Sequence, residues 1–218
     1  MTIPRAAVVR LFGHLAAERP HPTTELHYHT PFELLTAVML SAQSTDVGVN
    51  KATAKLFAVA NNPQRIVALG LDGVKPLIAS LGLYNNKSKY LVALSEQLIA
   101  LHGGEVPDDR QGLEALPGVG RKTANVLLNI LFDQPTLAVD THIFRVANRT
   151  GLAPGKTPLA VEQGLLKIIP NDYLMHAHHW LILHGRYTCM ARAPKCDRCV
   201  IRAECQWSNK LSNKLPNK

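Results

Sequence analysis

The sequence lacks cysteine before residue 189 and then places four within seventeen residues, at Cys189, Cys196, Cys199 and Cys205. It also lacks long apolar runs, and none approaches the ~18 residues of a membrane span. Arg5 and Arg10 interrupt the apolar N-terminal residues, where a secretory signal would need an unbroken segment. These absences predict a cytoplasmic protein with no membrane segment and no signal or transit peptide.

Alternation of apolar and polar residues is missing as well, as are hairpin dipeptides and internal repeats. Helical spacing is present instead, and one segment ended by Gly103 and Gly104 has leucines at helical intervals. These leucines are Leu91, Leu94, Leu98 and Leu101. Asn62 and Pro63 are typical of a helix start, and Gly70 of its end. The sequence therefore predicts an all-α fold of short helices.

The grouped cysteines are typical of a metal-ligand set. Two disulfides are the alternative, but 218 residues with 46% hydrophobic content can bury a core without cross-links. Zinc and iron–sulfur clusters both accept four thiolates. The spacing C-x6-C-x2-C-x5-C matches neither the usual zinc pairing nor the compact ferredoxin run, so it leaves the metal open.

The formal net charge is +8, and it is unevenly distributed. The chain carries a net charge of +2 up to Ile182 and of +6 from Leu183 onward. Such a basic region is expected of a protein that binds a polyanion, although a merely solvated basic surface is the alternative. We expect the short lysine-bearing tail at residues 209–218 to be flexible.

The string LPGVGRKTA at residues 116–124 predicts a tight turn between two helices. Glycine permits positive φ angles and lets a ligand approach the backbone closely. The amides of Gly118, Gly120 and the following helix would then form an anion site where DNA phosphate fits. An ordinary helical hairpin is the alternative.

Two side chains are candidates for catalysis. Lys122 lies in the first turn of the second helix, where the helix dipole and Arg121 favour loss of the ammonium proton, as an amine nucleophile requires. A solvated surface lysine is the alternative. Asp140 follows an apolar segment and precedes a helix starting at Thr141, so it is also a good N-cap. The two roles of Asp140 are compatible because a capped carboxylate is fixed and stays ionised.

Together these features resemble the endonuclease III family of bifunctional DNA glycosylase/AP lyases, within the helix–hairpin–helix glycosylases. The resemblance rests on residues 116–124, on VDTH at 139–142, on LSAQ at 40–43 and on the cysteine spacing. It extends from about Phe32 to Cys205. It implies a two-lobed all-α fold, with a six-helix lobe at residues 24–134 and a cluster lobe formed by residues 1–23 and 135–218.

The resemblance also implies roles for individual residues. The four cysteines would hold a [4Fe–4S] cluster, Lys122 would be the nucleophile and Asp140 the catalytic aspartate. Gln43 and Leu83 match residues that fill the gap in the duplex and wedge the opposite strand. The remaining expected DNA contacts are Gly118, Val119, Gly120, Arg121, Arg192 and Lys195.

The implied function is base excision repair. The protein would remove oxidised pyrimidines and then cleave 3′ to the abasic site by β-elimination through a Schiff base. Its partner would be double-stranded DNA with damaged bases or abasic sites, and we expect a monomer associated with the bacterial nucleoid. A monofunctional adenine-mismatch glycosylase and a non-catalytic iron–sulfur DNA-binding or redox protein are the alternatives. The presence of Lys122 disfavours the monofunctional glycosylase, and the presence of both Lys122 and Asp140 disfavours the non-catalytic protein.

Overall fold

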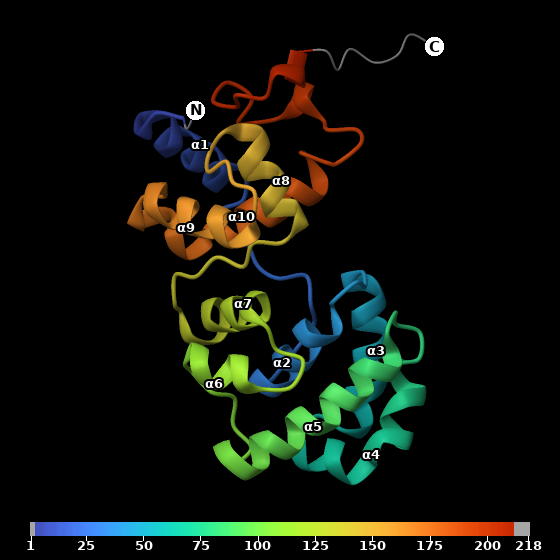
Figure 1. Ribbon diagram of the computed structural model, residues 1–218. Coiled ribbons are helices and arrows are strands. Elements are labelled where there is room, and N and C mark those ends of the chain that lie inside the picture. The colour runs from blue at the N-terminus through green and yellow to red at the C-terminus, as the bar shows by residue number, and fades with distance from the viewer. Residues whose placement is uncertain (1–2, 212–218) are drawn as a thin grey trace, which may run out of the picture. The chain divides into compact units, whose positions relative to one another are not determined.

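The computed structural model describes residues 3–211, in which the regular elements are all helices, confirming the predicted all-α class. The chain divides into two compact units (Figure 1). The hairpin unit comprises Glu25–Gln134, and the cysteine unit comprises the residues up to Thr24 and those from Pro135 onward. Across residues 3–211, no helix combines the length and apolar character needed to cross a bilayer.

Six helices build the hairpin unit: α2 (Pro31–Leu40), α3 (Asp46–Val59), α4 (Pro63–Ile78), α5 (Tyr84–His102), α6 (Arg110–Ala115) and α7 (Arg121–Phe132). Every α2 residue from Phe32 to Leu40 is buried. The helices α3, α5 and α7 pack against α2. A helix that is buried on all faces belongs in the centre of a core, and α2 takes this place in the hairpin unit.

The predicted helix start at Asn62 and Pro63 is confirmed, since the Asn62 side chain accepts the Arg65 N–H at 2.9 Å. The predicted end at Gly70 is confirmed, because the backbone leaves helical geometry at this residue and α4 consists of two helical segments joined across a kink. Gly70 adopts φ 66° and ψ −178°, and the second segment then continues to Ile78. Glycine tolerates this positive φ, which explains why the first segment ends here.

Helix α5 contains the predicted leucine stripe with one exception. Leu91, Leu94 and Leu98 are fully buried, whereas Leu101 is 68% exposed. Each helical residue turns the side chain by about 100°, so Leu101, seven residues after the buried Leu94, lies within about 20° of it on the same face. Leu101 therefore continues the stripe, but it lies in the last turn before Gly103 ends the helix.

The cysteine unit contains α1 (Arg5–Glu18), α8 (Thr141–Thr150), α9 (Pro158–Ile168), α10 (Asn171–Tyr187) and the short 3-10 helices η1 (Cys196–Arg198) and η2 (Ser208–Leu211). Helix α1 packs on α10. The Phe12 ring stacks on Tyr173 at 5.9 Å, and the Trp180 indole donates to the Arg19 carbonyl at 2.8 Å. These contacts join the two ends of the chain into one core.

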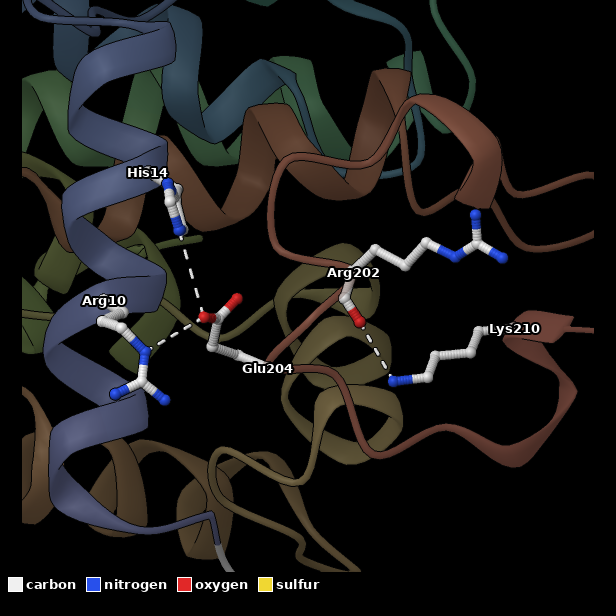
Figure 2. Close-up of polar contacts among 5 residues, drawn as sticks. All are labelled: Arg10, His14, Arg202, Glu204 and Lys210. Carbon is white, nitrogen blue, oxygen red and sulfur yellow. Dashed lines mark hydrogen bonds and ion pairs between the residues drawn. The ribbon is translucent and has the colours of Figure 1, made fainter.

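The segment around the last cysteine is also tied to its unit (Figure 2). Arg10 Nε of α1 lies 3.3 Å from Glu204 Oε1, and the Lys210 ammonium donates to the Arg202 carbonyl at 3.0 Å. The tail predicted to be flexible thus begins within η2, and its residues from 212 onward lie outside the described residues.

We predict that stability falls in mild acid because of His179. Burial, together with His176, lowers the His179 pKa from 6.5 to about 4. Between these values the unfolded chain binds a proton that the folded protein does not, so stability drops as pH falls. From about pH 7.5 to about pH 5 this group contributes a loss of about 2 kcal/mol. Urea unfolding of His179→Gln at both pH values should show a loss smaller by this amount, and an unchanged loss would contradict the assignment.

Candidate active site and cysteine centre

The glycine turn joins α6 to α7 in the hairpin unit. Asp109 begins α6 by accepting the Gly112 N–H at 2.9 Å. Gly118 has φ +79°, and a Cβ there would lie only 2.9 Å from the Tyr90 Cβ. Position 118 therefore needs glycine both for its backbone angle and for the close approach of Tyr90.

Gly120 differs from Gly118 in both respects. Its φ of −104° is ordinary extended backbone, and a Cβ there would meet no atom within 4 Å. The positive φ expected of the turn thus occurs at Gly118 and not at Gly120. Val119 lies between them with its side chain buried and its N–H donating to the Leu116 carbonyl at 3.1 Å. The side chain and amide of Val119 are therefore engaged inside the protein.

Lys122 is exposed in the first turn of α7, directly after this turn. The Ala124 N–H donates to the Gly120 carbonyl at 3.0 Å and makes the first bond of the helix. The amides of Lys122 and Thr123 precede that bond, so the helix itself offers them no acceptor. The exposed Arg121 adds positive charge at the same helix end.

Asp140 is the half-buried N-cap of α8 in the cysteine unit. Its Oδ1 accepts the His142 N–H at 2.9 Å and the Ile143 N–H at 2.8 Å, so the expected capping role is confirmed. Asp140 and Lys122 each stand at the beginning of a helix, and each belongs to a different unit. The two hydrogen bonds hold the carboxylate in place at the start of α8.

Gln43 and Leu83 lie in the hairpin unit with Lys122, on the connections α2–α3 and α4–α5. Both are exposed and both have left-handed backbone, with φ of 53° and 60°. A Cβ at Gly82 would lie 3.5 Å from the Gln43 carbonyl oxygen, so the two connections are adjacent. The structure thus brings together these two residues, which are forty positions apart.

The four cysteines line a single cavity with His184 and Trp207, and none forms a disulfide. Burial, reinforced by the other cysteines, raises the pKa of the Cys199 thiol to about 11. Burial also raises the pKa of Cys205. Four thiolates would require a cationic group at their centre. Within residues 3–211, no three His, Cys, Asp or Glu side chains are arranged to share one metal ion.

Arg192 and Lys195 are exposed on the stretch that follows Cys189. The Lys195 N–H donates to the Thr188 carbonyl at 2.9 Å, which closes this stretch into a loop. The two side chains therefore present positive charge at the surface of the cysteine unit.

Known proteins are similar to this chain in both sequence and fold. Residues 36–171 match the HhH-GPD superfamily of base excision DNA repair proteins. Endonuclease III of Haemophilus influenzae is 57% identical over 203 residues, covering 93% of this chain and 96% of that protein. Endonuclease III of Escherichia coli strain K12 is 56% identical over 207 residues, covering 95% and 98%.

A solved structure of a trapped endonuclease III–DNA covalent intermediate has a TM-score of 0.91 and 40% identity, covering 97% of this chain and all of that one. The chain belongs to the endonuclease III family. It is a bifunctional DNA glycosylase and AP lyase of base excision repair, as the sequence predicted. The two-lobed helix–hairpin–helix class expected for the fold is confirmed by the same matches.

Two arginines of α8 hold the cysteine loop of this endonuclease III family member, and the sequence analysis missed both. Arg149 donates to the carbonyls of Met190 at 2.7 Å and Ala191 at 2.8 Å. Its guanidinium also lies 4.4 Å from the Trp207 ring centroid and 3.7 Å from Cys189 Sγ. Arg145 donates to the Cys189 carbonyl at 2.9 Å. Their i, i+4 spacing on one helix was the available signal.

We predict that the two turn glycines respond differently to alanine. Gly118→Ala should lower the free energy of unfolding by about 1–3 kcal/mol, because it combines a left-handed φ with a clash against Tyr90. Gly120→Ala should cost less than about 1 kcal/mol, the difference between glycine and alanine at an N-cap. Urea unfolding measures both, and equal losses would show that the turn geometry described for Gly118 is incorrect.

Proposed function

We propose that this protein excises oxidised pyrimidines from duplex DNA as a monomer, with Lys122 as the nucleophile and Asp140 as the catalytic carboxylate. The placement of Lys122 carries this proposal. Its exposed amine follows Gly120, where no protein atom requires glycine and open space lies beside the backbone. Such space is what a DNA backbone would need to reach the amides at the start of α7.

Binding would begin with phosphate contacts. The amides at the start of α7 and the Arg121 side chain face the duplex from the hairpin unit, and Arg192 and Lys195 reach it from the cysteine loop. These contacts position the duplex without reading its sequence. The target nucleotide must then leave the stack, at an unstacking cost of a few kcal/mol that is least for damaged bases. Gln43 and Leu83, both exposed, would occupy the space it leaves.

Chemistry at the extrahelical nucleotide uses one carboxylate and one amine. As the bond between base and C1′ breaks, its electron pair leaves with the base, and the ionised Asp140 stabilises the positive charge developing on the sugar. The neutral Lys122 amine attacks C1′ and loses a proton, and ring opening gives a Schiff base. Loss of a C2′ proton then expels the 3′ phosphate and cuts the strand. Hydrolysis of the imine returns the free lysine.

Cys189, Cys196, Cys199 and Cys205 would hold a [4Fe–4S] cluster. Their half-buried thiols line one cavity, which supports a shared metal cofactor, and membership of the endonuclease III family favours an iron–sulfur cluster over one zinc ion. When bound, the cluster supplies the positive charge that keeps four cysteines as thiolates. The steps above rely on Lys122 and Asp140, and the cysteine loop contributes by presenting Arg192 and Lys195.

Separate variants test the two catalytic roles. On a duplex with one oxidised pyrimidine, Asp140→Asn should slow base release by at least about 100-fold, because it removes the charge that stabilises the transition state. Lys122→Ala should abolish strand cutting, including on a duplex that already holds an abasic site. Lys55→Ala, which removes an exposed lysine of α3, is the matched control and should retain both activities. Strand cutting by folded Lys122→Ala at the wild-type rate would refute the proposed nucleophile.

A second prediction concerns the cofactor. Arg149→Gln removes two hydrogen bonds to the cysteine loop, so we expect purified protein with less iron and weaker visible absorbance than wild type. Arg202→Gln removes the same charge from an exposed side chain near the cysteines and should leave the iron content unchanged. Equal iron in all three proteins would show that Arg149 does not secure the loop. Zinc in place of iron in the wild type would refute the cluster assignment.

A further inference from the structure

Two residues of the hairpin unit hold unusual backbone geometry on exposed connections. Gln43 and Leu83 are two of the three non-glycine residues with positive φ among residues 3–211. Leu83 is also the N-cap of α5, although its side chain makes no capping hydrogen bond. Backbone of this kind persists only where surrounding contacts hold it. Contacts with neighbouring residues must therefore stabilise the two connections.

Lys87, one turn into α5, is buried beneath both connections. Only 3% of this residue is exposed. Its ammonium donates to the Ser44 hydroxyl at 2.8 Å, and Ser44 directly follows Gln43. Its backbone N–H donates to the Leu83 carbonyl at 3.0 Å, which is the i to i−4 bond of the first turn of α5 and does not depend on the lysine side chain. Lys87 is therefore held one turn after the α4–α5 connection, and its side chain bonds this point to the α2–α3 connection.

The burial of this lysine argues for a specific role. Desolvation lowers the Lys87 pKa, which means that the fold bears a cost for placing an ammonium here. An apolar side chain of similar length, such as methionine, would fill the same space without this cost. The hydrogen bond to Ser44 is what a lysine supplies and a methionine does not.

We propose that Lys87 is a positioning residue that locks the α2–α3 and α4–α5 connections together and so presents Gln43 and Leu83 to the duplex at a fixed spacing. This inference rests on the proposed function, in which those two side chains enter the gap left by the extrahelical nucleotide. Because Lys87 is buried, it acts on DNA through them and not by touching phosphate.

The test is binding to two duplexes of one sequence, one undamaged and one with a tetrahydrofuran abasic analogue that the enzyme cannot cut. A 2-aminopurine opposite the analogue reports unstacking by its fluorescence. Lys87→Met should bind the analogue duplex about 10-fold more weakly, with a smaller fluorescence rise, because one hydrogen bond from a charged donor is lost. Binding to undamaged duplex should stay within about 2-fold, since phosphate contacts are intact.

Lys55→Met is the matched control, because it removes an exposed lysine of the same unit and should leave the ratio of the two affinities unchanged. Ser44→Ala removes the acceptor and should reproduce the Lys87→Met loss in part, with no further loss when the two are combined. Ser44→Ala also serves as the test if Lys87→Met does not fold.

The combined variant Gln43→Ala, Leu83→Ala separates the proposed entry of these two side chains into the duplex from the positioning role of Lys87. It should reduce the ratio of the affinity for the analogue duplex to that for the undamaged duplex, and adding Lys87→Met should reduce this ratio no further. If Gln43→Ala, Leu83→Ala leaves the ratio unchanged, their proposed entry into the duplex is wrong and the role of Lys87 falls with it. The inference about Lys87 alone is wrong if Gln43→Ala, Leu83→Ala lowers the ratio of affinities while Lys87→Met and Ser44→Ala both leave it unchanged. It is also wrong if adding Lys87→Met to Gln43→Ala, Leu83→Ala lowers the ratio further.

Discussion

The cap that Asp140 places on α8 fixes the helix on which the cysteine loop depends. The carboxylate accepts two amides of the first turn, an interaction that contributes about 0.5–2 kcal/mol at a typical N-cap. Further along the same helix, Arg145 and Arg149 bind backbone carbonyls of the segment that begins at Cys189. One short helix therefore carries a proposed catalytic group at its beginning and the side chains that secure the cysteine loop along its length.

In the hairpin unit, too, neighbouring side chains hold the proposed functional groups in place. Exposed residues with a proposed role in DNA binding or catalysis are held by buried or closely packed neighbours. Tyr90 packs against Gly118 and sets the turn before Lys122, and Lys87 underlies the connections that carry Gln43 and Leu83. Positioning of this kind matters because displacement of a reacting group by about 1 Å can cost catalysis about 100-fold.

Much of this could be predicted from local sequence. Helix starts at Asn62 and Asp140 are encoded by a side chain and an amide within three residues, and the structure confirms them, as it does the break at Gly70. The exposed Leu101 and the contacts of the α8 arginines could not be predicted in this way, because each depends on tertiary packing or on partners distant in the chain. Lys87 is four and seven residues before the buried Leu91 and Leu94 and so falls on their face of α5, whereas Lys89 does not. Helical spacing could not identify its partner Ser44, which lies forty-three residues away in the chain.

The central claim is that the Lys122 amine forms the covalent bond to DNA. The most direct measurement is borohydride reduction during reaction with a duplex that contains one abasic site, followed by mass spectrometry of the cross-linked peptide. We expect an adduct on Lys122 that disappears in Lys122→Ala and persists in Lys55→Ala. An adduct on another residue, or none from folded and cofactor-loaded wild type, would contradict it.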